Sequence, residues 1–243
     1  MSRDAAGRAR QQRGWRGWQR RWKDRWLAAG GEEARRGAMI DMLVFDHGIL
    51  RLAWRNFHEI DPGVWRGSQP DPATIRKLAA RGFATILNLR GETEWGSYLL
   101  ERETCREVGI RLIDVKLNSR SLPQVETILG LDAIFAEAAR PMLIHCKSGS
   151  DRAGFAAALY LLLRTDARVE QARAQLSWRY LHLRSGGTGV LGYMLDAYAA
   201  EAARAPIRFR DWLTTRYDRE ALQAAYRSGA VAGFVTDQLL GRE

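Results

Sequence analysis

Residues 141–154, PMLIHCKSGSDRAG, join an apolar run to a loop of small residues and then to a sequence that favours a helix. The run 142–145 predicts a short buried strand that delivers Cys146 to the start of the loop. Arg152 follows six residues later, at the predicted start of the helix. A thiol and a guanidinium are therefore expected at the same end of one strand.

Strands and helices alternate outward from this stretch. The Asp71-Pro72 pair predicts a helix start, with Asp71 as the N-cap and proline at the first helical position. Short elements are expected at 42–45, 57–60 and 64–66, strands at 83–89 and 110–117, and helices from 72, over 93–108 and over 123–139, with a mostly helical remainder. This order predicts an α/β fold with a mainly parallel central sheet of about four to five strands, flanked by helices.

The charge of the chain is concentrated at its N-terminus. The 243 residues carry a formal net charge of +10, of which residues 1–37 contribute 11 Lys/Arg minus 4 Asp/Glu, or +7. We therefore divide the chain into a basic, Trp-rich tail, 1–37, and a domain, 38–243, with a helical C-terminal part. No apolar run has the roughly 18 residues of a membrane span, and no signal peptide is evident. With only two cysteines, a cytoplasmic location is expected.

The loop after Cys146 has the composition of an anion-binding site around a nucleophile. A cysteine attacks only as a thiolate, and converging backbone N–H groups with a helix N-terminus supply the positive potential that favours this form. Small residues let the N–H groups turn inward, while Arg152 can donate two parallel hydrogen bonds to an oxyanion. A thiolate and a guanidinium facing one dianion are equipped to attack a phosphate monoester.

The order His145-Cys146-x5-Arg152 resembles the signature of the protein tyrosine phosphatase superfamily, and residues 63–92, GVWRGSQPDPATIRKLAARGFATILNLRGE, resemble the lead-in of its compact dual-specificity-type bacterial members. The resemblance covers about residues 56–200. It implies a tyrosine-phosphatase-like fold, with Cys146 as the nucleophile, Arg152 as the phosphate clamp and His145 as loop support. The phosphate cradle would consist of Lys147, Ser148, Gly149, Ser150, Asp151 and Arg152. No metal or organic cofactor is implied.

The sequence departs from this pattern directly after the arginine. The family usually has Ser or Thr there, whose hydroxyl stabilises the leaving thiolate, whereas this chain has Ala153. Either Ser148 or Ser150 substitutes for that hydroxyl, or the intermediate breaks down slowly.

The general acid is the second departure. Relatives usually carry an Asp on a loop about thirty residues before the cysteine; Asp114 has that separation but falls inside the predicted strand 110–117. Asp151 stands in the loop beside Arg152, where some lipid-directed members of the superfamily carry their acid. We favour Asp151, with Asp114 as the alternative and Glu126 as a third candidate.

The tail places Trp15, Trp18, Trp22 and Trp26 within an arc of about 80° if it is helical, with Arg and Lys around most of the rest. Such a helix suits the surface of an anionic membrane, although docking of the tryptophan stripe on the domain is the alternative. No recognition fold for nucleic acid accompanies the tail, so nucleic acid is not an expected partner.

The leading interpretation is a cysteine-dependent phosphatase that acts on phosphotyrosine proteins or phosphorylated lipids through a cysteinyl-phosphate intermediate. The alternatives are a phosphatase specific for membrane lipids or phosphoinositides, with a peripheral location at the inner face of the membrane, and a pseudophosphatase that binds phosphate without turnover. Cys105 is expected to be a core thiol, with a protective disulfide to Cys146 as the alternative.

Overall fold

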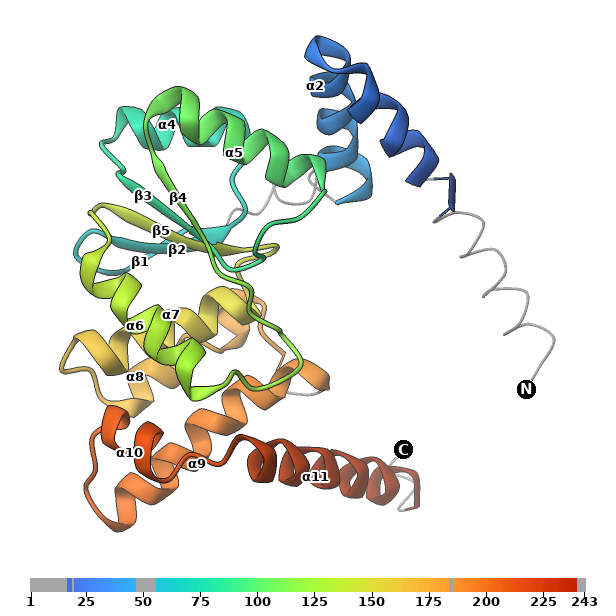
Figure 1. Cartoon of the computed structure of the whole chain (residues 1–243). Coiled ribbons are helices and arrows are strands. Elements are labelled where there is room, and N and C mark those ends of the chain that lie inside the picture. Colours follow the sequence, from blue (N-terminus) through green and yellow to red (C-terminus); the bar gives the residue numbers. More distant parts are fainter. Residues whose placement is uncertain (1–16, 19, 47–55, 184–185, 240–243) are drawn as a thin grey trace.

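The computed structural model describes residues 17–18, 20–46, 56–183 and 186–239, with the side chains described up to residue 229. A central sheet lies between two layers of helices (Figure 1). The helices α4 (Pro72–Ala80) and α5 (Gly96–Val108) cover one face, and α6 (Val125–Glu137) and α7 (Asp151–Arg164) cover the other.

The sheet has five strands in the order β1-β2-β5-β3-β4. The bounds are His58–Asp61 for β1, Val64–Ser68 for β2, Thr85–Asn88 for β3, Arg111–Asp114 for β4 and Met142–Cys146 for β5. The β1–β2 hairpin is antiparallel and the other pairings in the sheet are parallel. Strands β3 and β5 are buried along their whole length, as expected of central parallel strands that helices cover on both faces. The predicted α/β fold is confirmed.

Side chains of β5 alternate between two cores. Leu143 packs with Ile75, Leu78 and Ile86 beneath α4 and α5. Met142, Ile144 and Cys146 belong to the larger core beneath α6 and α7. Because successive strand residues point to opposite faces, His145 lies on the α4/α5 side and Cys146 on the α6/α7 side.

The helix starts follow local sequence. The Asp71 carboxylate accepts hydrogen bonds from the N–H groups of Ala73, at 2.9 Å, and Thr74, at 3.0 Å, which confirms the predicted cap of α4. The strand predicted at 110–117 is shorter than expected, since β4 ends at Asp114. Asp114 therefore closes a strand rather than standing inside one.

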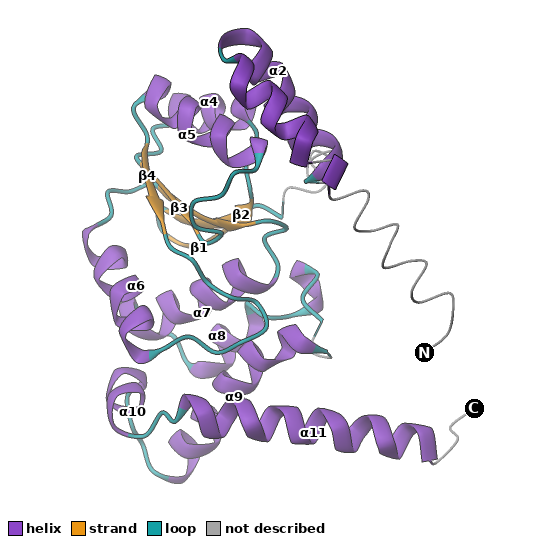
Figure 2. Ribbon diagram, turned by 45° about the vertical axis from the view of Figure 1, so that its right-hand side comes forward, coloured by secondary structure: helices purple, strands orange, loops and turns teal. Residues whose placement is uncertain are grey.

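The remainder of the chain is helical and lies beyond α7 (Figure 2). It comprises α8 (Val169–Ala174), α9 (Val190–Arg204), α10 (Phe209–Thr215), α11 (Arg219–Leu239) and two short 3₁₀ turns, Trp178–Tyr180 and Gly187–Gly189. Phe209, Trp212 and Leu213 of α10 pack into the core beneath α7.

The N-terminal segment forms a helical hairpin beside α5 (Figure 2). Residues 20–29 are helical, α2 spans Gly31–Ile40, and a π-helical turn, Asp41–Phe45, replaces the separate short element expected at 42–45. Trp26 is buried against Ala38, Met42 and Leu100 of α5. Helix α2 thus crosses the boundary drawn at residues 37 and 38, and Trp15 lies outside the described residues.

None of the described helices is long and apolar enough to cross a membrane.

Candidate active site

Cys146 is the last residue of β5, buried between β2 and β3 at the carboxyl edge of the sheet. Residues 147–150 form the loop that leads into α7, which begins at Asp151. Gly149 has φ +75°, and a Cβ placed on it would lie 2.7 Å from the carbonyl carbon of Gly67. Both the backbone conformation and the contact with β2 therefore require glycine at the third loop position.

Two side chains from outside the loop fix its carbonyl groups. Asn56 donates from Nδ2 to the Ser148 carbonyl at 3.2 Å. Arg66, on β2, donates from one guanidinium nitrogen to the carbonyls of Gly149, at 2.5 Å, and Ser150, at 3.1 Å. In a trans peptide the C=O and the following N–H point in opposite directions. The N–H groups after these three carbonyls are consequently turned away from Asn56 and Arg66.

Arg66 is fully buried, although it carries a charge. Its other guanidinium nitrogen donates to the backbone carbonyl of Gln175 at 2.6 Å, and the group lies 4.0 Å from the centre of the Tyr180 ring. Burial lowers the pKa of Arg66 to about 10. Even so, the side chain stays protonated near neutral pH, and it links the loop to the helical part beyond α7.

The His145 side chain lies on the opposite face of the sheet from that of Cys146. Its Nε2 lies 2.7 Å from Oε1 of Glu101, and both side chains are fully buried. The second carboxylate oxygen of Glu101 accepts from Gln69 Nε2 at 2.7 Å. The Nδ1 atom of His145 is 3.4 Å from the carbonyl oxygen of Cys146. His145 therefore contacts the backbone of the cysteine, while its ring packs on the α4/α5 side.

Arg152 lies in the first turn of α7, which begins directly after the loop. Among the described residues it forms no ion pair, which leaves its guanidinium available to an oxyanion. The next residue, Ala153, is completely buried in the core beneath α7. Ser148 donates from Oγ to Oγ of Ser150 at 3.2 Å, and Ser150 is the buried member of the pair. The two candidate hydroxyls thus form one chain inside the loop.

The two candidate acids differ in position. Asp151 stands on α7 beside Arg152, and its Oδ1 lies 2.7 Å from Nδ1 of the buried His182. Asp114 ends β4, two strands away from β5, and accepts hydrogen bonds from Asn88 Nδ2 at 2.7 Å and Tyr98 OH at 2.8 Å. Burial and the bond to Asp114 raise the pKa of Tyr98 well above its usual value.

Asp114 also lies on the opposite face of the sheet from Cys146. Asp114 pairs in register with Asn88, which pairs with His145, so its side chain shares the α4/α5 face. Cys146 faces α6 and α7. The third candidate, Glu126, is exposed in the first turn of α6. Of the three, only Asp151 adjoins the loop, as the first residue of α7.

Cys105 lies on α5 in the core beneath α4 and α5, across the sheet from the core that contains Cys146. Both thiols are free, and burial raises the pKa of Cys105 to about 12. Its surroundings are those of a core residue.

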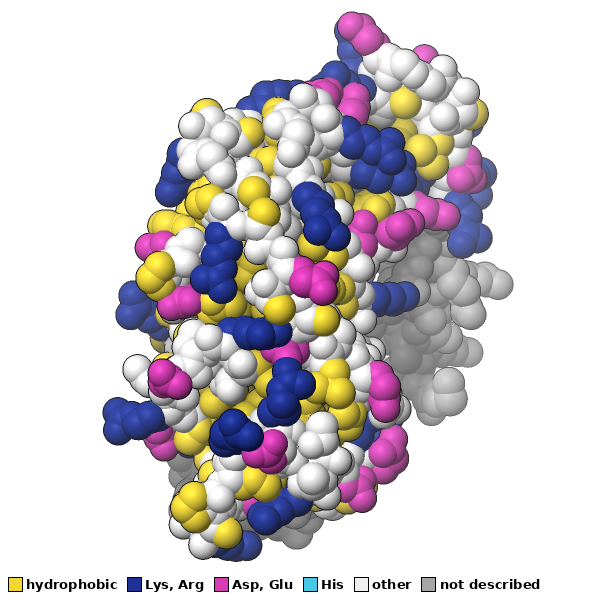
Figure 3. Space-filling view, turned by 60° about the vertical axis from the view of Figure 1, so that its left-hand side comes forward, with side chains coloured by type: hydrophobic (Ala, Val, Ile, Leu, Met, Phe, Trp, Pro, Cys, Tyr) yellow, Lys and Arg dark blue, Asp and Glu magenta, His cyan; other side chains and the backbone are white. Residues whose placement is uncertain are grey.

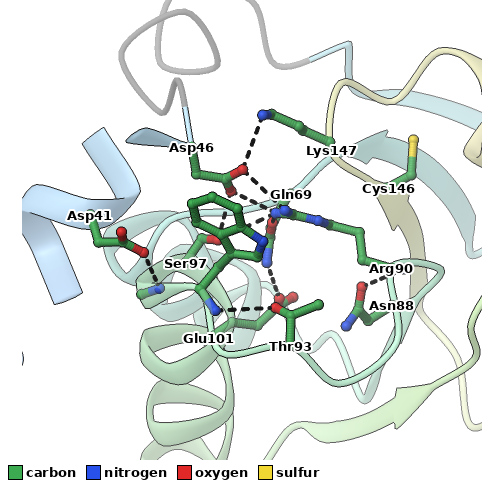
Figure 4. Close-up of polar contacts among 12 residues, drawn as sticks. Asp41, Asp46, Gln69, Asn88, Arg90, Thr93, Ser97, Glu101, Cys146 and Lys147 are labelled. Carbon is green, nitrogen blue, oxygen red and sulfur yellow. Dashed lines mark hydrogen bonds and ion pairs between the residues drawn. The ribbon is translucent and has the colours of Figure 1, made fainter. Parts of the chain in front are cut away.

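Lys147, next to the cysteine, belongs to an ionic cluster (Figure 4). Its Nζ lies 3.1 Å from Oδ1 of Asp46, which also binds the Arg90 guanidinium with distances of 2.6 and 3.0 Å. Gln69 accepts from Arg90, and Ser97 donates to Asp46 at 2.7 Å. Asp46 follows the π-helical turn of the N-terminal hairpin, so the hairpin contacts the rim of the loop.

The family model described as "DSP-PTPase phosphatase fused to NAD+ Kinase" matches residues 56–185, which are 130 of the 243 residues. The chain belongs to this family. It is a tyrosine-phosphatase-like phosphoric monoester hydrolase of the compact dual-specificity type.

Solved structures of other phosphatases are similar to this one at low sequence identity. TpbA of P. aeruginosa is 16% identical, with 70% of this chain and 90% of that chain covered and a TM-score of 0.47. Tk-PTP in its active form is 19% identical, with 59% and 98% covered and a TM-score of 0.48. The core catalytic domain of the PP-IP phosphatase SIW14 from S. cerevisiae is 20% identical, with 63% and 96% covered and a TM-score of 0.47.

Several residues that build the phosphatase loop were not assigned by sequence reasoning. Arg66 and Arg90 both stand in the lead-in 63–92, where Arg66 ends the element expected at 64–66 and Arg90 follows the strand expected at 83–89. Asn56, Asp46 and His182 lie outside any recognisable motif, and only the fold brings them to the loop.

Proposed function

We propose that this phosphatase hydrolyses phosphate monoesters through a cysteinyl-phosphate intermediate on Cys146. One observation carries the proposal: the carbonyl groups of residues 148–150 are held from outside by Asn56 and Arg66. The opposing N–H groups, at the start of α7, can then surround a phosphate beside the sulfur. A loop that merely connected a strand to a helix would not need a fully buried arginine to hold its carbonyls.

In the first step the thiolate of Cys146 attacks phosphorus, the S–P bond forms and the P–O bond to the leaving group breaks. Arg152 donates to the equatorial oxygens, and its charge stabilises the negative charge of the transition state. We assign Asp151 as the acid that protonates the leaving oxygen, because it stands beside Arg152 in the loop.

In the second step water attacks the phosphocysteine and gives its proton to the Asp151 carboxylate, while the S–P bond breaks and the thiolate is restored. The leaving thiolate lacks a hydroxyl at position 153. Ser150, buried in the loop and bonded to Ser148, is the hydroxyl that we propose stabilises it.

We propose phosphotyrosine proteins or phosphorylated lipids as substrates, with lipid access through the N-terminal hairpin. Trp18 is 45% exposed, and the helical residues 20–29 beyond it carry several Arg and Lys side chains. By contrast, the described face in Figure 3 shows Lys and Arg interspersed with Asp, Glu and apolar side chains. The proposal for peripheral membrane binding therefore rests on the hairpin rather than on that face.

A phosphate-release screen of phosphotyrosine peptides, phosphoinositides and bacterial lipid phosphates tests the function. Cys146→Ser serves as the blank, because a serine hydroxyl is too weakly acidic to attack unaided. We expect release by the native protein with at least one class, none from the Cys146→Ser protein and none from Arg152→Ala. Release that persists in Cys146→Ser would overturn the nucleophile assignment.

A further inference from the structure

Arg90 and Lys147 both direct their charges at Asp46, a residue from outside the matched phosphatase region. Asp46 is 1% exposed and binds Arg90 through both carboxylate oxygens. Figure 4 shows the side chains of Arg90 and Lys147 extending toward Asp46, with the Cys146 sulfur to one side of them.

The two cations stand beside the phosphate loop for a topological reason. Lys147 follows Cys146 directly, and Arg90 comes two residues after the end of β3, the strand next to β5. The Leu89 N–H donates to the His145 carbonyl at 2.9 Å, so the two chain segments remain in register up to this point. Both cations therefore lie at the carboxyl edge of the sheet that also carries the nucleophile.

The chemistry that holds Asp46 also suits a phosphate group. A guanidinium binds carboxylate and phosphate alike with two parallel hydrogen bonds, and an ammonium adds a point charge. The Lys147 side chain is 38% exposed, whereas that of Arg90 is 9% exposed. The cluster can consequently be approached from the Lys147 side, which is the side of the loop.

We propose that Arg90 and Lys147 form a second anion site, which Asp46 fills in this structure and a second phosphate group of the substrate fills after displacing Asp46. The inference rests on the proposed function only in placing the first phosphate at Cys146. Asp46 then competes with every substrate that carries two phosphates and with none that carries one. The site would select bisphosphorylated substrates, whether soluble or in a lipid head group.

Binding to the full-length Cys146→Ser protein, which cannot turn substrate over, tests the inference. The probes are ethane-, propane- and butane-diol bisphosphates with their matched monophosphates, measured by titration calorimetry with and without Asp46→Asn. Asparagine keeps the size of the side chain and removes the charge. We expect Asp46→Asn to lower the Kd of the tightest-binding bisphosphate by about tenfold and to change the Kd of the monophosphates by less than about twofold.

Asp132→Asn is the matched control. Like Asp46, Asp132 is a buried carboxylate bound by two cationic side chains, in this case those of Arg164 and Arg210. It lies on α6, however, and contacts the end of α7 that is remote from the loop. This control should leave the binding of both probe classes unchanged. If Asp46→Asn likewise leaves the ratio of bisphosphate to monophosphate affinity unchanged, the cluster only fastens the hairpin and the inference is wrong.

Lys147→Gln tests the same site without a substitution at a buried residue. It should weaken the binding of bisphosphates about fivefold relative to that of monophosphates. An unchanged ratio of the two affinities would contradict the inference even if Asp46→Asn does not fold. Vesicles carrying a phosphoinositide with one or two head-group phosphates distinguish the sources. A preference for the diol bisphosphates that extends to the vesicles identifies a lipid head group, and one that is confined to the diol bisphosphates identifies a soluble substrate. Loss of monophosphate binding alone would count against the proposed function rather than against this site.

Discussion

Nδ1 of His182 lies 2.7 Å from Oδ1 of Asp151, so a histidine 31 residues further along the chain fixes the carboxylate of the phosphate loop. His182 is buried, and its Nε2 has no hydrogen-bond partner among the described residues. An N–H at Nδ1 would donate to this carboxylate oxygen. The pair orients one oxygen of Asp151 and leaves the other for the substrate.

Asp151→Asn should slow the turnover of poor leaving groups far more than that of good ones. An alkyl phosphate needs protonation of its leaving oxygen, whereas a nitrophenyl phosphate needs little. We expect a loss of about 10²–10⁴ in kcat with an alkyl phosphate and less than about tenfold with nitrophenyl phosphate, measured by steady-state kinetics.

Asp114→Asn is the comparison for this experiment. Its carboxylate is bonded to Tyr98 and Asn88 on the opposite face of the sheet, so the change should cost stability without selectivity for the leaving group. The assignment reverses if Asp114→Asn shows the selectivity and Asp151→Asn does not.

His182→Phe should act through Asp151, as expected of a positioning residue. The ring is retained in its buried site, while the hydrogen bond to Asp151 is lost. We expect about a tenfold lower kcat for alkyl phosphates and a much smaller loss with nitrophenyl phosphate, which needs little protonation. The rate of Cys146 alkylation should not change. A fall in alkylation as well as in kcat, with equal losses for the two leaving groups, would mean that His182 only stabilises the fold.

Much of this site could be predicted, because its parts are local in sequence. The strand that delivers Cys146, the small residues of the loop and the start of α7 occupy one continuous stretch. The Asp71 cap of α4 was likewise encoded within three residues. Periodicity and capping rules act over such distances, so the α/β fold and the position of Cys146 followed from them.

The supporting contacts could not be predicted, since each joins segments that only the folded chain brings together. Arg66 reaches Gly149 from 83 residues away, and Asn56 reaches Tyr180 from 124. The strand predicted through residue 117 ended at Asp114, because the chain then leaves the sheet and pairs Lys116 with Arg90 in an isolated bridge. The hydrophobic pattern of the sequence alone does not predict that pairing.

Arg66→Met should impair both stability and catalysis. It leaves the buried carbonyl of Gly149 without its donor, at a cost of about 1–3 kcal/mol, whereas the Ser150 carbonyl loses the bond from Arg66 but keeps the one from the Gly154 N–H. We expect a lower Tm and a fall in kcat/KM of about 10²–10³, since the cradle N–H groups lose their fixed direction. Calorimetry and steady-state kinetics with an aryl phosphate measure the two effects.

Arg76→Met is the control for Arg66. Arg76 lies on α4, is half-exposed and pairs with Glu107 at the surface, so its loss should cost less than about 1 kcal/mol and leave kcat/KM unchanged. Equal kinetics for the two variants would show that the loop does not depend on Arg66.

Ala153→Ser should speed the hydrolysis of the phosphocysteine if that step limits turnover. The position is buried directly after Arg152, and serine adds the hydroxyl that the family usually has there. We expect a burst of leaving group in the native protein and a smaller burst with a higher steady-state rate in the variant, followed by stopped flow. If the native protein shows no burst and the variant no change in rate, then Ser150 already supplies the hydroxyl.

Trp18 and Trp26 should separate membrane binding from docking of the hairpin. Trp26 is 5% exposed against Leu100 of α5, so Trp26→Ala should lower stability by about 3–5 kcal/mol. Trp18 is 45% exposed, and Trp18→Ala should change stability by less than about 1 kcal/mol while weakening binding to anionic vesicles. High salt should release the native protein only in part, because ions screen the cationic share of binding and leave indole burial unaffected.

Trp178→Ala, which removes a 71% exposed tryptophan from the helical part beyond α7, is the control for vesicle co-sedimentation. If Trp178→Ala weakens sedimentation and Trp18→Ala does not, the lipid contact lies on the domain, and the hairpin serves only to pack against α5.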